Sequence, residues 1–327
     1  MRINQIGEFG LIDLIKKKIS SEDKRVIVNI GDDAAVIRTS PDRLLIFTTD
    51  TLVERIHFHL DYFSFEEIGW KAMAANLSDI AAMGGRPKYA LVTVGLPKLI
   101  QAESVLSIYK GMSKIARRYE CKIIGGDTTL VPKDLFVTIA LLGEVEEKFL
   151  TTRSGAKNGD FICVTGNLGE AQAGLAYLRK YGRDRLSFVR KHLQPYPRIS
   201  EARTLVRNLR IHSMIDISDG LSSELFHIAE ESGLGAVVLE ESIPVSPKCL
   251  RLASVLNQSP LSLALSSGEE YELLFTVSRK DSAKIERMQK RLNVSVIGEM
   301  TDRTRGIRLI RRSGKITKLR KMGFVHF

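Results

Sequence analysis

The sequence has few cysteines and no long apolar run, and these absences exclude several classes of protein. Its 327 residues include three cysteines, Cys121, Cys163 and Cys249, which are far apart and lack the spacing of paired metal ligands. We therefore expect buried thiols in a reducing cytoplasm. No stretch approaches the roughly 20 apolar residues that span a bilayer, and the N-terminal stretch lacks the apolar core of a signal peptide. We expect neither a membrane protein nor a secreted one.

Several catalytic motifs are also missing. The sequence contains no G-x-S-x-G, no H-E-x-x-H, no G-x-x-x-x-G-K-[ST] phosphate loop, and no HRD or DFG pair. These absences argue against a serine nucleophile, a zinc hydrolase and the two common types of ATP site. If the protein handles a nucleotide, it must hold the phosphates in another way.

Positive charge is in excess, because 49 basic residues outnumber 38 acidic ones and give a net charge of +11. The basic residues are dispersed, and between 303 and 321 they alternate with apolar residues, as on the solvated face of edge strands. No RNA-binding module or zinc finger pattern is visible. We expect no nucleic-acid partner, and an anionic small substrate explains part of the charge as well.

The sequence does contain many aspartates in short, glycine-bearing stretches, and most of them follow an apolar run that predicts a strand. Carboxylates at strand ends, beside Gly and Thr or Ser, are typical of Mg²⁺ sites that share a bound phosphate. Several Mg²⁺ ions held in this way would neutralise phosphates that Lys and Arg neutralise elsewhere. The aspartates are Asp32, Asp33, Asp50, Asp79, Asp127, Asp216 and Asp219.

Asp79 lies within the stretch 76–85, around which the other motifs are arranged. Residues 64–83 have apolar side chains at helical spacing, and Gly84 and Gly85 stop the predicted helix. Asp79 lies there among Ala, Ser and Gly, which let another backbone come close. Taken alone, it is either a metal ligand or a solvated helix aspartate.

The order of predicted elements indicates a mixed α/β fold. The length suits two domains, and the polar, turn-rich stretch 145–160 places their boundary, giving domains 1–147 and 148–327. Residues 1–20 read as an amphipathic helix, and 54–60, with His57 and His59, as an alternating strand. A strand over 121–124 is expected to end before the GGDTT stretch at 125–129.

Seven stretches in order resemble the thiamine-monophosphate kinase family: GDDAAV, TTDTLVERIHF, NLSDIAAMGG, GGDTT, TRSGAKNGD, IDISDGL and SGEEYELLF. One departure is Ser267 and Glu270, where many members have Gly and Asp. The resemblance implies phosphorylation of thiamine monophosphate by ATP in an aminoimidazole ribonucleotide synthetase-like fold of two domains. It also implies a homodimer whose N-terminal domains pair into a shared barrel. The alternative is another ATP-dependent synthetase of the superfamily, with an activated phosphate intermediate.

The resemblance also assigns residues to roles. Asp50, Asp127 and Asp219 are implied as catalytic. The implied metal ligands, for several Mg²⁺ ions, are Asp33, Thr48, Thr49, Asp50, Asp79, Asp127, Asp216 and Asp219. The implied ATP contacts are Tyr109, Gly126, Asp127, Arg153 and Ser218. Thiamine monophosphate would meet His57, Glu269 and Phe324. A buried structural histidine is the alternative for His57, and core filling by a docked C-terminal tail is the alternative for Phe324.

Overall fold

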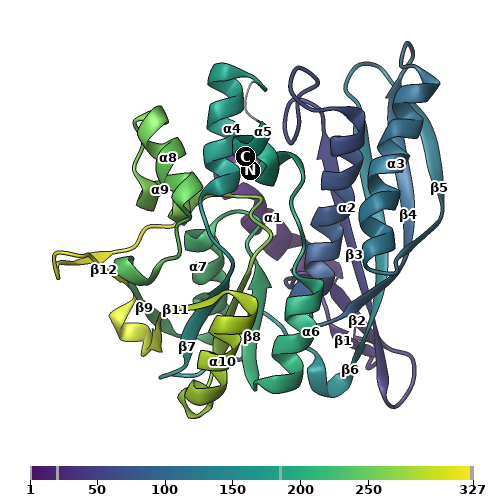
Figure 1. The fold of residues 1–327 in the computed structure, drawn as a ribbon. Helices are drawn as coiled ribbons and strands as arrows, with labels where there is room; N and C mark the ends of the chain where they lie inside the picture. The colour runs from purple at the N-terminus through teal and green to yellow at the C-terminus, as the bar shows by residue number, and fades with distance from the viewer. Residues whose placement is uncertain (1, 20–21, 184–185, 325–327) are drawn as a thin grey trace.

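Two mixed sheets with helices packed against them make up the computed structural model, which describes residues 2–19, 22–183 and 186–324 (Figure 1). This confirms the predicted mixed α/β fold class. The first sheet ends at Glu146 and the second begins at Phe161, so the predicted boundary at 147/148 falls between them. None of the helices within the described ranges is long and apolar enough to cross a membrane.

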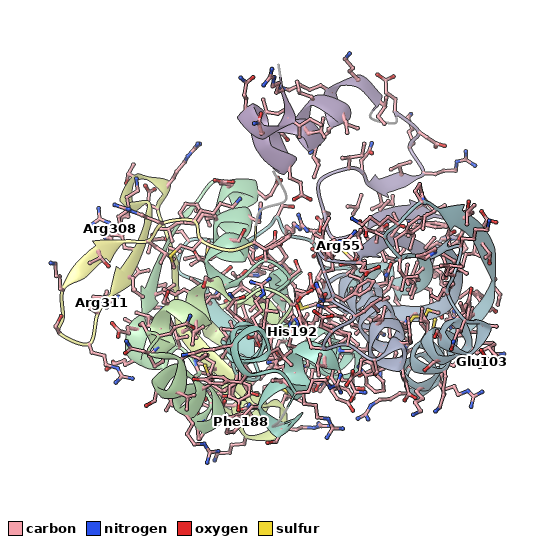
Figure 2. All side chains as sticks on the ribbon, turned by 90° about the horizontal axis from the view of Figure 1, so that it is seen from above. Arg55, Glu103, Phe188, His192, Arg308 and Arg311 are labelled. Carbon is pink, nitrogen blue, oxygen red and sulfur yellow. The ribbon has the colours of Figure 1, made fainter. Side chains whose placement is uncertain are left out.

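The first sheet belongs to the N-terminal half and has the strand order β1-β2-β3-β6-β4-β5. Strands β4 and β5 pair in parallel, and the other neighbours are antiparallel. Helices α2 and α3 cover one face of this sheet (Figure 1). Viewed from above, α1 stands out from both halves (Figure 2). The bounds are α1 Ile3–Ile19, β1 Val26–Val28, β2 Ala35–Arg38, β3 Arg43–Val53, α2 Phe65–Ala82, β4 Arg86–Pro97, α3 Ala102–Arg118, β5 Lys122–Val131 and β6 Phe136–Glu146.

The second sheet has the order β13-β12-β9-β11-β7-β10-β8, with one parallel pair, β9 and β12. Its strands are β7 Phe161–Thr165, β8 Ile211–Asp216, β9 Gly235–Leu239, β10 Leu273–Val277, β11 Val294–Thr301, β12 Ile307–Ile310 and β13 Ile316–Lys318. The helices of this half are α4 Glu170–Tyr181, α5 Leu186–Leu193, α6 Ile199–Asn208, α7 Leu221–Ser232, α8 Pro247–Leu256, α9 Pro260–Ser266 and α10 Ser282–Leu292.

Helix α2 is the element that both halves share. It begins with a capping box, in which the Glu67 amide donates to Ser64 Oγ and the Ser64 amide donates to Glu67 Oε2. It ends before Gly84, whose φ of +69° suits glycine. Nearly all its residues are buried, because it packs on the first sheet, on α3, and on α6 and β8 of the other half. The helix expected over 64–83 is therefore confirmed, with Ser64 as its cap.

Three local expectations were wrong. Residues 54–60 form turns, because the chain leaves β3 at Val53 and folds back so that the Arg55 amide donates to the Phe58 carbonyl. Strand β5 does not stop before GGDTT but runs through it, since residues 125–131 keep pairing with β4. In α1, we expected Leu14 and Ile15 on the buried face of the amphipathic helix, but they are 42% and 40% exposed, so that face is only partly covered.

Two glycines let α2 and α3 touch backbone to backbone. A Cβ at Gly69 would lie 1.9 Å from the Ile108 carbonyl oxygen, and one at Gly111 would lie 1.9 Å from the Glu66 carbonyl oxygen. Alanine normally favours a helix over glycine by about 1 kcal/mol. Here the helices would have to move apart, and overpacking of this kind costs roughly 1–3 kcal/mol.

We therefore expect Gly69→Ala to lower the melting temperature, measured by calorimetry. Gly174→Ala in α4 is the matched control, because its Cβ would come no closer than 3.3 Å to its nearest neighbours, Phe188 and Val189; it should change stability little. An unchanged or higher melting temperature for Gly69→Ala would contradict the close approach of α2 and α3.

Candidate active site

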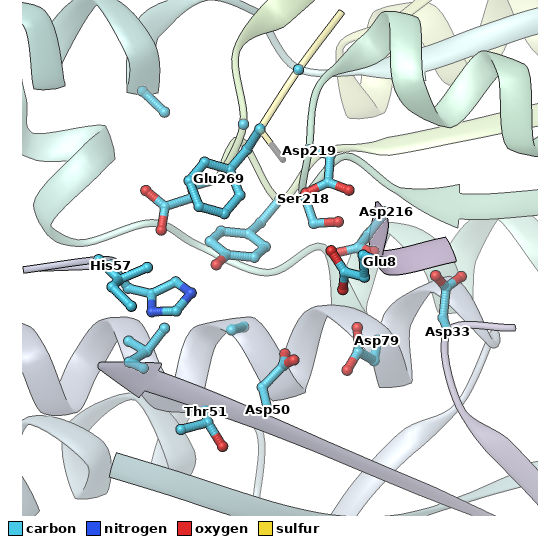
Figure 3. Close-up of a pocket in the computed structure, with 18 of the residues that line it drawn as sticks. Glu8, Asp33, Asp50, Thr51, His57, Asp79, Asp216, Ser218, Asp219 and Glu269 are labelled. Carbon is cyan, nitrogen blue, oxygen red and sulfur yellow. The ribbon is translucent and has the colours of Figure 1, made fainter. Parts of the chain in front are cut away.

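A cavity of about 1390 Å³ is lined by residues of both halves (Figure 3). Its walls come from α1, the β1–β2 turn, β3 and α2 on one side, and from α4, the β8–α7 turn and the segment before β10 on the other. Most of the predicted site residues line it: Asp33, Thr48, Thr49, Asp50, His57, Asp79, Arg153, Asp216, Ser218, Asp219, Glu269 and Phe324.

Carboxylates gather at one end of the cavity. Asp79 of α2 faces β3, and the Thr48 hydroxyl donates to it. Asp216, at the end of β8, accepts a hydrogen bond of 2.6 Å from the Ser78 hydroxyl. Asp33, in the β1–β2 turn, forms an ion pair of 2.6 Å with Arg153. Three different elements therefore bring acids to one place, and two of these acids follow strands, as the strand-end pattern predicted.

Burial and mutual repulsion make it unfavourable for these acids to ionise. Burial, followed by the nearby charges of Asp50, Asp216 and Asp33, raises the pKa of Asp79 well above its usual value. Burial and Asp33 raise the pKa of Asp216 to about 8. The Asp33 Oδ2 atom is buried and has no hydrogen-bond partner among the described residues. Over the described ranges as a whole, no group of three or more His, Cys, Asp or Glu side chains is arranged closely enough to hold a metal ion. The cluster is thus a loose group of hard oxygen donors in which added positive charge would relieve repulsion.

The other end of the cavity holds Glu269, whose side chain is 24% exposed. Its Oε1 atom is 2.6 Å from Lys71 Nζ, and its Oε2 atom is 3.3 Å from His192 Nδ1. Burial alone would raise the pKa of Glu269, but the Lys71 charge and the His192 hydrogen bond lower it to about 2. Sequence reasoning missed Lys71 and His192. The signal for Lys71 was a lysine inside the apolar run of α2.

His57 and Phe324 border the same end. The Val53 amide donates to His57 Nδ1 at 3.0 Å, and the rings of His57 and Phe324 are 6.2 Å apart at 50°. The Phe324 amide donates to the Asp219 carbonyl at 3.2 Å, and a Cβ at Gly323 would lie 2.4 Å from that oxygen. The tail is therefore docked as far as Phe324, which stays 45% exposed. Residues 325–327 lie outside the described residues.

Tyr109, Gly126 and Asp127 are not brought to this cavity. Tyr109 lies on α3, and the other two lie on the exposed edge strand β5. Across the sheet, Thr51 of β3 pairs with Thr138, Thr138 with Thr93, and Thr93 with Asp127. Asp127 is three strands from β3, or roughly 14 Å at the usual strand spacing.

Known proteins resemble this chain along its whole length. It is 40% identical to thiamine-monophosphate kinase of Buchnera aphidicola subsp. Schizaphis graminum, over 99% of each chain. It is 35% identical to thiamine-monophosphate kinase of Bacillus subtilis, over 98% of this chain and 100% of that one. The chain belongs to the thiamine-monophosphate kinase family. Residues 31–145 match the N-terminal domain of AIR synthase related protein, and 157–310 match its C-terminal domain.

A solved structure of AaThiL complexed with AMPPCP and TMP has the same fold. The TM-score is 0.87 and the identity 33%, over 100% of this chain and 99% of that one. Hydrogenase maturation protein HypE in complex with ATP is similar in fold alone, with 21% identity and a TM-score of 0.72 over 88% of this chain and 87% of that one. The predicted family and fold are thereby confirmed.

The repulsion at Asp79 generates a prediction about the metal-free protein. Because its folded-state pKa is raised, ionised Asp79 lowers stability increasingly as pH rises above the usual Asp value. Asp79→Asn keeps an acceptor for Thr48 but removes the charge. We expect the variant to melt a few degrees higher than the parent at about pH 8, and to differ less at about pH 5.

Asp160 provides the matched control. It is also buried, but its Oδ2 atom shares a hydrogen bond of 2.7 Å with His212 Nδ1. Asp160→Asn should therefore lower the melting temperature, because it removes an attraction. If Asp79→Asn destabilises the metal-free protein as Asp160→Asn does, Asp79 has a structural role.

Proposed function

We propose that this chain transfers the γ-phosphoryl group of ATP to thiamine monophosphate and releases thiamine diphosphate and ADP. The observation that carries the proposal is one cavity with acids at one end and Glu269, His57 and Phe324 at the other. Full-length similarity to proteins named thiamine-monophosphate kinase supports this activity. The AaThiL complex with AMPPCP and TMP supports the choice of ATP and thiamine monophosphate as ligands.

The acid end fits Mg²⁺. Its donors are hard oxygens, Asp33 Oδ2 has no partner among the described residues, and mutual repulsion raises the pKa of Asp79. Mg²⁺ bound there would neutralise phosphate charge. The proposed ligands are Asp33, Thr48, Thr49, Asp50, Asp79, Asp216 and Asp219, together with Asp127 of a second copy. Asp50, Asp127 and Asp219 are proposed to meet the reacting phosphates.

The chemistry needs no strong base from the protein. A phosphate oxygen of thiamine monophosphate attacks the γ-phosphorus, and the bond from that phosphorus to the β,γ-bridging oxygen breaks. The attacking phosphate is already ionised near neutral pH, since its second pKa is about 6. The task of the chain is to hold two polyanions in line. Arg153 and Ser218, which line the cavity, are proposed to contact ATP.

The aromatic end suits the thiamine rings. Phe324 is 45% exposed and lines the cavity, which favours a stacking surface over core filling. An aromatic face can stack on the pyrimidine and attract the cationic thiazolium, each interaction contributing roughly 0.5–1.5 kcal/mol. His57 is proposed to donate a hydrogen bond to the substrate phosphate, because its Nδ1 already accepts from Val53.

The proposal includes a homodimer. On the face of the first sheet away from α2, large apolar side chains are open: Phe47 is 40% exposed, Tyr89 45% and Leu91 50%. Asp127 pairs in register with Thr93 on this face, and β5 also exposes Ile124 nearby. A second copy packed here would cover these side chains and carry its Tyr109, Gly126 and Asp127 toward the cavity. Such contiguous apolar patches mark interfaces.

The proposal also covers the domain division and the cellular location. We divide the chain into an ATP- and Mg²⁺-binding dimerisation domain, 1–147, and a domain that completes the substrate site, 148–327. The three cysteines are buried and unpaired. We place the protein in the cytoplasm, where such thiols stay reduced.

A product assay tests the activity. With ATP, Mg²⁺ and thiamine monophosphate, we expect thiamine diphosphate and ADP in equal amounts and no inorganic phosphate, measured by chromatography. Asp219→Asn should reduce turnover at least about 100-fold, because it removes a charge from the phosphate site. Its circular dichroism should match that of the parent. Release of inorganic phosphate with ADP would instead indicate a synthetase with an activated phosphate intermediate.

A mixing experiment tests the shared site. Asp127→Asn and Asp219→Asn should each be inactive as homodimers. If Asp127 serves the cavity of its partner, a mixed dimer has one cavity with both defects and one with neither. Refolding the two variants together should therefore restore about a quarter of parental activity, since half the dimers are mixed and each has one intact site. No recovery despite mixed dimers, shown by mass spectrometry, would place Asp127 outside the partner's site.

A further inference from the structure

Lys71 is a lysine whose side chain is completely buried, although it lies beside the cavity. Its Nζ atom is 2.6 Å from Glu269 Oε1 and 2.7 Å from the His57 carbonyl oxygen, and it lies 5.1 Å from the centre of the Phe63 ring. A buried ion pair is often no more stable than a well-packed apolar pair of the same volume. Stability alone therefore gives little reason for a lysine at this point of α2.

The contacts of Lys71 fix Glu269 on the side away from the cavity. His192 Nδ1 lies 3.3 Å from the second carboxylate oxygen, and the His192 ring meets Phe63 edge to face at 5.4 Å. The Glu269 amide donates to the Ser218 carbonyl at 2.7 Å, and its φ is +58°. Both the backbone and the two oxygens of Glu269 thus have set positions. Figure 3 shows its carboxylate on the same side of the cavity as His57.

Helix α2 ties this arrangement to the acid end. Lys71 and Asp79 are eight residues apart and share one helix face with Ala75, which lines the cavity between them. Eight residues of helix span about 12 Å. One rigid helix therefore sets the distance from the acid end of the cavity to Glu269.

We propose that Lys71 is a positioning residue: it holds the Glu269 carboxylate where that carboxylate meets the organic part of thiamine monophosphate. The inference rests on the function proposed above. Lys71 does not touch the substrate, because its own side chain is enclosed. It acts through Glu269, and its hydrogen bond to the His57 carbonyl anchors the ammonium group in place.

A double-mutant cycle tests this role with Lys71→Met, Glu269→Gln and the double variant. We expect Lys71→Met to raise the KM for thiamine monophosphate about tenfold and to leave the KM for ATP within about twofold. In the double variant, the KM for thiamine monophosphate should stay within about twofold of that of Glu269→Gln, because Lys71 then has no carboxylate to position. If the two losses multiply, Lys71 acts independently of Glu269 and the proposal is wrong.

Arg203 provides a matched control outside the cavity. It also joins a backbone carbonyl and a carboxylate, donating to Gly84 O at 2.6 Å and Glu146 Oε2 at 2.7 Å. Arg203→Met should lower the melting temperature and change neither KM selectively. If Lys71→Met behaves as Arg203→Met does, with both KM values moving together or not at all, Lys71 is only structural.

Two further outcomes are decisive. If Lys71→Met does not fold, the double variant is compared with Glu269→Gln, because the double variant leaves no unpaired buried charge. Equal KM values for thiamine monophosphate support the proposal, and a KM more than about fivefold higher in the double variant overturns it. If the parent protein makes no thiamine diphosphate, the proposed function fails. The binding of thiamine monophosphate to the same variants, measured by calorimetry, then decides the role of Lys71 separately.

Discussion

The burial of α2 between the two halves is the constraint on which the rest of the structure depends. A helix enclosed on several sides cannot leave its polar side chains in water, so each of them needs a partner in the protein. Asn76 accepts from the Asp50 amide and donates to the Ala72 carbonyl, Ser78 donates to Asp216, and Lys71 pairs with Glu269. Two of these partners lie in the other half. The hydrogen bonds and the ion pair that the polar side chains of α2 form therefore also fix the walls of the cavity.

The same enclosure sets the electrostatics of the two ends. At the acid end, burial adds to repulsion among carboxylates; the Arg153 guanidinium pairs with Asp33, while the Arg153 backbone amide donates to the Asp32 carboxylate. At the other end, Lys71 and His192 overcome the effect of burial and keep Glu269 ionised. At one end, ionisation of the carboxylates is unfavourable until a ligand supplies positive charge, whereas at the other end Glu269 is paired before any ligand binds. Local instability like that of the acid end is common where function and stability compete.

Sequence reasoning succeeded where the signal was local. The apolar spacing of α2 and the glycines that end it lie within one stretch, and the aspartates after strands were found one by one. It failed where the answer depended on distant pairing. Nothing within GGDTT reveals that β4 continues beside it, so Asp127 was expected in a turn and lies within a strand. His57 was placed on a strand because its alternation is real, while the turn is set by contacts with Val53 and Phe58.

The order of motifs also cannot tell which chain supplies each residue. Motifs that act together were expected in one place, yet β5 keeps Gly126 and Asp127 on the edge of the first sheet, away from the cavity. An edge strand that exposes glycines, threonines and apolar residues tends to associate with another chain, which disfavours a stable monomer. In the proposed dimer, β5 would instead help to complete the site, because the strand that a second copy covers would carry Gly126 and Asp127 to that copy's cavity. Binding of phosphates across the two chains would then stabilise the dimer by mass action, and the dimer would strengthen phosphate binding to the same degree. Assembly and catalysis would thus depend on a single surface, which explains how an exposed acid on an edge strand can belong to a site that its own chain does not close.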